Sequence, residues 1–153
     1  MKKEDGAKIV ARNKKAKFEY FLEDSFEAGI VLQGSEIKSI RAGQVSLRES
    51  YIQVDGDEAW MIDCHIAPYN QANRYNHDPK RPRKLLLHKR EIARLYDKIR
   101  QRGYTVIPTR MYLRRGLAKV EIALARGKKQ HDKRQAIAKR DAEREMRRAV
   151  RRR

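Results

Sequence analysis

The chain has 153 residues, room for one compact domain with an appendage, and its 38 Lys and Arg against 20 Asp and Glu give a formal net charge of +18. Such a charge favours a densely negative partner, most commonly a phosphate backbone. A membrane span, a secretory signal and an intrachain disulfide are not expected, because no apolar run is long enough, no apolar stretch follows the N-terminus and Cys64 is alone. These features predict a cytoplasmic protein.

The first element predicted along the chain is a half-buried strand. Phe18, Tyr20 and Leu22 alternate with polar residues at period two, which turns one face of the segment inward. A second apolar stretch covers 29–33, and residues 36–41 predict one short helical turn. The N-terminal part is therefore expected to be mainly β.

Residues 52–66 predict a hairpin with its turn at 55–57. A free cysteine behaves as a small buried hydrophobe, so Cys64 is expected in the core. The inward face of the second strand is predicted to carry Trp60, Ile62, Cys64 and Ile66.

A long basic loop is predicted at 70–83, because this segment is polar and contains Pro79 and Pro82. Its cations, which could meet a polyanion or simply remain solvated, are Arg74, Lys80, Arg81 and Arg83.

A helix and a second hairpin follow the loop. Residues 88–102 have apolar side chains at helical spacing and stop at Gly103, which favours a helix packed on the sheet. Residues 105–124 predict two strands around a turn at 114–116, with Lys119 on the outer face. Several short strands and one helix favour a mainly β (α+β) fold, a small closed barrel of about six strands, over a layered α/β fold.

The tail, residues 126–153, contains 13 Lys or Arg and 4 Asp or Glu, a net charge of +9. Its few apolar residues are too small to offset the entropy of ordering the segment alone. We expect it to become ordered against a polyanion as a helix of about 20 residues and roughly 30 Å. Asp132 followed by Gln135 resembles a helix-opening cap.

No residue set predicts catalysis, a metal or a cofactor. The histidines lack zinc-site spacing, and the glycines form no phosphate-binding motif. Asp55, Asp57 and Glu58 surround Gly56, which favours a turn over a divalent-ion site. The lone acid Glu27 could accept hydrogen bonds from RNA base edges or be an ordinary surface carboxylate, and both interpretations stay open.

Four blocks of this sequence, at residues 28–32, 34–41, 81–92 and 127–134, resemble the bacterial SsrA-binding protein (SmpB) family. The resemblance runs from about Ile9 into the tail in the family's order. It implies an oligonucleotide-binding (OB)-like β-barrel over residues 1–125, with the helix around 88–102, and a separate basic tail over 126–153.

The resemblance also implies a function. The protein is expected to be a non-enzymatic adaptor, a monomer when bound, that binds the tRNA-like domain of transfer-messenger RNA (tmRNA). The complex would enter stalled ribosomes for trans-translation, and the tail would pass the decoding centre of the 16S rRNA into the empty mRNA channel. A small ribosomal protein whose tail threads rRNA is the alternative, and an RNA-processing enzyme is a third.

Residue by residue, the resemblance implies two groups of RNA contacts. Glu27 and Asn13 would make polar contacts to bases or sugars, Leu86 would pack on a base and Lys119 would bind phosphate. In the tail, Gly127 would supply a bend, His131 would stack on an rRNA base and Asp132 would contact RNA or cap the helix. The decoding-centre residues implied are Gly127, Lys128, Lys129, His131, Asp132, Lys133 and Arg134.

Overall fold

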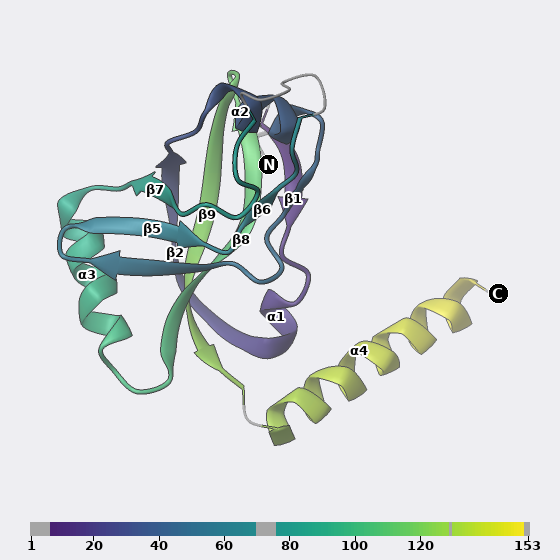
Figure 1. Ribbon diagram of the computed structural model, residues 1–153. Coiled ribbons are helices and arrows are strands. Elements are labelled where there is room, and N and C mark those ends of the chain that lie inside the picture. The colour runs from purple at the N-terminus through teal and green to yellow at the C-terminus, as the bar shows by residue number, and fades with distance from the viewer. Residues whose placement is uncertain (1–6, 70–75, 129, 152–153) are drawn as a thin grey trace.

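The computed structural model describes residues 7–69, 76–128 and 130–151, and most of its regular structure is antiparallel sheet (Figure 1). The strands are β1 Lys8–Arg12, β2 Tyr20–Ile30, β3 Val45–Ser46, β4 Tyr51–Asp55, β5 Glu58–Ile62, β6 His65–Ile66, β7 Arg83–Leu86, β8 Tyr104–Arg114 and β9 Leu117–Gly127. The helices are α1 Ala16–Glu19, α2 Gly34–Arg41, α3 Lys89–Ile99 and α4 Gln130–Arg151. The prediction of a mainly β protein with accompanying helices is confirmed.

The sheet is open, so the predicted closed barrel is not found. Seven strands pair in the order β1-β8-β9-β2-β7-β5-β4, and within the described ranges β1 and β4 are its edges. The short strand β3 lies against β1, but its backbone pairs with β6 in a separate two-stranded ribbon. Closure would need a continuous hydrogen-bonded ladder between the edge strands, and this ribbon does not supply one.

The first predicted strand begins later than expected, because a short helix replaces its first half. Residues Ala16–Glu19 form α1, and the strand β2 starts at Tyr20. Ala16 is buried against Ile107 and Ala125, so tertiary packing overrides the local alternation. The strand then continues to Ile30 as one of the three long strands at the centre of the sheet.

The hairpin at 52–66 is confirmed, but one inward face was predicted wrongly. Ala59 and Met61 are fully buried, whereas Trp60 and Ile62 are only half-buried. Asp63 adopts a left-handed φ of 59° and interrupts the strand, so the alternation restarts with Cys64 and Ile66 inside. Cys64 is buried as expected, and burial raises the pKa of its thiol to about 12.

The second hairpin and the packed helix agree with the sequence. Strands β8 and β9 are joined by Arg115 and Gly116, both at positive φ, as a tight type I′ turn requires. Helix α3 starts after His88, whose backbone N–H donates to the Glu91 carboxylate at 3.0 Å. The α2 prediction is also confirmed, with two more residues at its N-terminal end.

The tail forms helix α4, which stands away from the sheet beside α1 (Figure 1). The side chains of residues 137–149 are all exposed, including Met146 at 70%. Helix α4 lies close to where the sequence predicts a helix. That a polyanion is needed to order it stays a prediction. The side chain of Arg140 lies 5.7 Å from the ring centre of Phe18 in α1, a weak surface contact.

Candidate RNA interface

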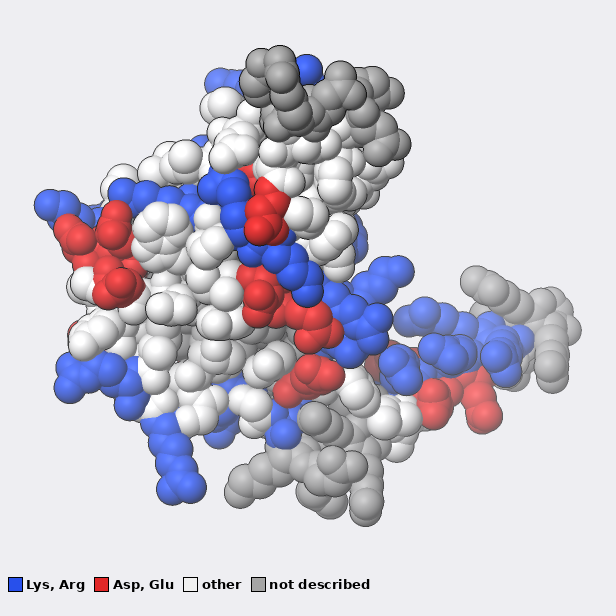
Figure 2. Space-filling view, in the orientation of Figure 1, with Lys and Arg blue, Asp and Glu red and all other residues white. Residues whose placement is uncertain are grey.

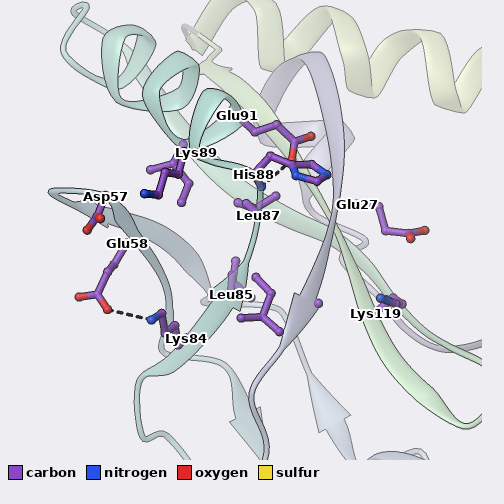
Figure 3. Close-up of a pocket in the computed structure, with 13 residues that line it drawn as sticks. Glu27, Asp57, Glu58, Lys84, Leu85, Leu87, His88, Lys89, Glu91 and Lys119 are labelled. Atoms are coloured by element: carbon purple, nitrogen blue, oxygen red, sulfur yellow. Dashed lines mark hydrogen bonds and ion pairs between the residues drawn. The ribbon is translucent and has the colours of Figure 1, made fainter.

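A groove of about 600 Å³ opens on the outer face of the sheet, where β2, β7 and β9 meet the start of α3. Figure 3 shows Glu27 and Lys119 on one side and Lys84, Glu58 and Asp57 on the other, with Leu85 and Leu87 between them. Leu86 and Gly29 also line the groove. The structure thus brings together three of the four residues that the family resemblance implies for RNA contact: Glu27, Leu86 and Lys119.

Strand register explains why these residues meet. Gly29 of β2 pairs with Leu86 of β7 on one side and with Lys119 of β9 on the other. A Cβ on Gly29 would lie 3.3 Å from the Leu86 Cβ and 3.4 Å from its Cδ1, tighter than ordinary packing. Glycine therefore lets Leu86 lie across the groove floor while 56% of it stays exposed. An exposed leucine beside a lysine can contact both a base face and a phosphate.

Glu27 is not the isolated acid that the sequence suggested, because side chains of β8 bind its carboxylate. Its Oε2 accepts hydrogen bonds from the Tyr112 hydroxyl and, at 3.0 Å, from Arg114 Nη1. Burial, and then the hydrogen bond to Glu27, raise the pKa of Tyr112 above its ordinary value. The carboxylate of Glu27 is thus one part of a charged network on the sheet face.

A second acid–arginine pair lies one strand away. Glu121 of β9 is directly opposite Glu27 in the β2–β9 register. Its carboxylate accepts from Arg110 Nε and Nη2, both at 3.1 Å, and from Thr109 Oγ1 at 2.8 Å. Two carboxylates side by side repel, and the two arginines offset that repulsion.

Asn13 lies apart from the groove, at the end of β1. Its side-chain amide donates to the Pro108 carbonyl at 3.0 Å and to the Leu47 carbonyl at 3.5 Å. Its backbone N–H donates to the Thr109 carbonyl at 2.8 Å. Asn13 therefore holds the chain before α1 against β8, and it borders other hollows of the surface.

Positive charge on the groove side is mixed with negative charge. Figure 2 shows Lys and Arg interleaved with Asp and Glu over the body in this view. Lys84 pairs with Glu58 at 3.0 Å, and Glu91 accepts the backbone N–H of His88 at 3.0 Å. The excess positive charge predicted from composition is thus distributed unevenly, and the groove is a polar, charge-paired surface with an apolar floor.

The predicted basic loop does not present all its cations to solvent. Arg83 starts β7 and is fully buried, where its guanidinium binds Glu36 and, at 2.6 Å, the Cys64 carbonyl. Arg81 also binds Glu36, at 2.5 Å. Burial alone would raise the pKa of Glu36, but hydrogen bonds from Arg81, the Gln33 backbone and Arg83 hold it below the ordinary 4.5. Arg74 lies outside the described residues.

The tail leaves the sheet at a fixed point. Lys128 donates its backbone N–H to the Glu19 carbonyl at 3.0 Å and its Nζ to the Lys17 carbonyl at 2.9 Å. Gly127 ends β9 outside the left-handed region, and a Cβ there would meet nothing within 4 Å, so this structure gives no steric reason for glycine. Lys129 lies outside the described residues, as do the side chains of His131, Asp132, Lys133 and Arg134.

Sequence reasoning missed Tyr112 and Arg114, which complete the network around Glu27. A signal for them was present. Arg110, Tyr112 and Arg114 are spaced two apart in the second predicted hairpin, so they share one face of the strand. Glu27, the partner of Tyr112 and Arg114, lies more than 80 residues away along the chain, and local patterns carry no information on that pairing.

Across residues 7–69, 76–128 and 130–151, no helix is long and apolar enough to cross a membrane. Over the same part of the chain, no three His, Cys, Asp or Glu side chains gather in a way that could hold a metal ion.

The fold and site define a class: a mainly β protein with a polar, apolar-floored groove on its sheet and a separate basic helix. The model of the SmpB protein family matches residues 10–152, and the chain belongs to this family. An SsrA-binding protein of Halothermothrix orenii is 55% identical over 150 residues, 98% of this chain and 97% of that protein. An SsrA-binding protein of Roseiflexus castenholzii is 57% identical over 147 residues, 95% of this chain and 93% of that protein.

A solved structure is also similar. It is described as "tmRNA-SmpB: a journey to the center of the bacterial ribosome". One of its chains matches with a TM-score of 0.68 and 42% identity, covering 82% of this chain and 92% of that one. At this identity the likeness extends beyond the general fold.

Proposed function

We propose that this protein is a cytoplasmic, non-enzymatic adaptor that binds the tRNA-like domain of tmRNA and delivers it to stalled ribosomes for trans-translation. The observation that carries the proposal is the meeting of Glu27, Leu86 and Lys119 in one groove. The names of its relatives, SsrA-binding proteins, and the tmRNA–SmpB structure support the choice of RNA.

The groove suits an irregular RNA better than a uniform duplex. Proteins recognise unpaired RNA bases by stacking and edge hydrogen bonds, while cations fix the backbone. Leu86 offers an exposed apolar surface for one base, and Lys119, on the other side of Gly29, offers a charge for a phosphate. Asn13 supports this face indirectly by holding the β1–α1 connection to β8.

The tail serves the ribosome in this proposal. Helix α4 has 22 residues, about 33 Å at the usual rise of 1.5 Å per residue. Its exposed, positively charged surface suits a channel lined by rRNA phosphates, and an mRNA occupying that channel would exclude it sterically. Lys128, anchored at α1, fixes where the helix leaves the body.

A binding assay tests the first half of the proposal. The dissociation constant of the full chain should be lower for a tmRNA tRNA-like domain than for an elongator tRNA of equal length at the same salt concentration. Leu86→Ala should weaken tmRNA binding, while Leu117→Ala, at another exposed leucine outside the groove, should not. Equal affinity for both RNAs would contradict the proposal.

Ribosome fractionation separates the proposal from the ribosomal-protein alternative. An adaptor should be enriched on stalled ribosomes and depleted from salt-washed, translating ones. A constant one-to-one presence in washed ribosomes would support a ribosomal protein with an rRNA-threading tail instead.

A further inference from the structure

Arg114 is held in place at the rim of the groove with donors to spare. Its Nη1 donates to Glu27 Oε2 at 3.0 Å, and its guanidinium lies 5.3 Å from the ring centre of Tyr112. About a third of the side chain, 31%, is exposed. In the part of the chain that the structure describes, its buried Nε has no hydrogen-bond acceptor. The guanidinium is thus oriented on two sides but not saturated.

Arg110 is the matching residue on the same face of β8, and its guanidinium is held differently. Its Nε and Nη2 both contact the same oxygen, Glu121 Oε2, at 3.1 Å. Its guanidinium lies 5.1 Å from the ring centre of Tyr112. Tyr112 therefore contacts two arginines. Arg110 binds its acid through two nitrogens, and Arg114 binds its acid through one.

This arrangement limits what Glu27 can do by itself. The Tyr112 hydroxyl and Arg114 both donate to its Oε2. A base edge binding at Oε2 would have to compete with these two donors. The same two bonds keep the Arg114 guanidinium fixed against the tyrosine ring.

We propose that Arg114 is a phosphate-binding residue of the groove and that Glu27 acts mainly by positioning it. This inference rests on the proposed RNA-binding function and gives the network a specific role in it. A guanidinium offers its N–H groups in a planar fork that matches phosphate oxygens, and the exposed third of the Arg114 side chain is the part that an incoming phosphate can reach. Holding the side chain in advance lowers the ordering cost of binding.

The proposal reverses the sign that simple electrostatics gives for Glu27. Removing an acid from an RNA-binding surface should strengthen binding and steepen its salt dependence. If Glu27 holds Arg114, then Glu27→Ala should instead weaken binding and flatten the salt dependence, because one phosphate contact is lost. Each lost contact should lower the slope of log Kd against log salt by about 0.7 to 0.9.

A double-mutant cycle tests the proposal with full-length protein and the tmRNA tRNA-like domain at several KCl concentrations. We expect Glu27→Ala and Arg114→Ala each to weaken binding about tenfold, the size of one charge-assisted hydrogen bond. The double variant should be no weaker than either single one. Arg114→Lys should restore the salt slope but only part of the affinity, because an ammonium lacks the fork.

Arg110→Ala is the matched control, because it removes the same charge beside the same tyrosine. Its effect should be smaller than that of Arg114→Ala and should combine additively, in free energy, with that of Glu27→Ala. Thermal unfolding checks that all variants are folded. If a variant is not, Tyr112→Phe tests the same link, since it removes only the hydroxyl that binds Glu27, and it should weaken binding by a smaller factor.

Two results would overturn the inference. One is full additivity of Glu27→Ala and Arg114→Ala in free energy; the other is an unchanged salt slope in Glu27→Ala. Either would mean that Glu27 contacts the RNA itself, while specific binding by the unaltered protein would still uphold the proposed function. Failure of the unaltered protein to prefer tmRNA would instead reject the proposed function.

Discussion

The groove and helix α4 carry charge in opposite ways. In the groove, charges are largely paired within the sheet, as in Glu27 with Arg114 and Lys84 with Glu58, around an apolar floor. In α4, the side chains of residues 137–149 are exposed and cations outnumber acids. Paired charges favour recognition by shape and geometry, whereas an excess of exposed cations favours any dense polyanion. One chain thus combines a selective surface with a largely unselective one.

Removing the unselective region should have the largest effect. A chain ending at Lys128 keeps β9 and the anchor at α1 but lacks α4. Its affinity for the tmRNA tRNA-like domain should stay within about threefold of the full chain, because the groove is intact, whereas peptide tagging on stalled ribosomes should be abolished. Binding and reconstituted tagging assays measure the two effects. A large loss of tmRNA affinity would contradict the division of labour.

The next largest effect should come from breaking the buried ion pair between Glu36 and Arg83. Glu36→Ala would leave Arg83 buried without its partner carboxylate, at a cost of about 3 kcal/mol in the free energy of unfolding. Denaturant unfolding measures this cost. Glu49→Ala, at an exposed pair with Arg48, should change stability little.

The same carboxylate should make stability depend on pH. Because the pKa of Glu36 in the folded state lies below its ordinary value of 4.5, its contribution is complete above that value. The contribution is lost as the pH falls through the lowered pKa. Unfolding free energies of the unaltered protein and Glu36→Ala should therefore converge as acid is added. If the difference between the two unfolding free energies widened in acid instead, the pKa of Glu36 would be raised in the folded state.

The sequence predicts local elements of the molecule better than it predicts the side-chain pairs around the groove. The tail helix and the β8–β9 hairpin follow from local signals, such as the charge pattern of α4 and the turn residues Arg115 and Gly116. Glu36 and Arg83 are 47 positions apart, and Glu27 and Arg114 are 87 apart. Such pairings depend on strand order, which period-two patterns do not encode. The sequence therefore places Arg83 in a basic loop, whereas the structure buries it at the start of β7.

A smaller effect on tmRNA binding is expected from a change at the groove floor. Gly29→Ala would press a methyl group against Leu86 and should weaken tmRNA binding by about threefold through a shift of that side chain. In a Leu86→Ala background, the same change should have almost no effect on the dissociation constant. An equal loss in both backgrounds would show that Gly29 acts on something other than Leu86.

The smallest effect should come from the contact between the two regions. Phe18→Leu removes the ring beneath Arg140, a surface cation–π contact of about 0.5 to 1 kcal/mol. Spin-label distances between α1 and α4 should broaden, while the dissociation constant for tmRNA stays the same. A change in that constant would mean that the orientation of α4 influences the groove.

The division between a selective groove and a ribosome-directed tail is tested most directly by tagging yield measured against tmRNA concentration. Leu86→Ala should need more tmRNA but reach the full yield, because only binding is impaired. The chain ending at Lys128 should give no tagged product at any tmRNA concentration. Tagged product from the truncated chain at high tmRNA concentration, or a lower maximum yield with Leu86→Ala, would contradict this division of roles.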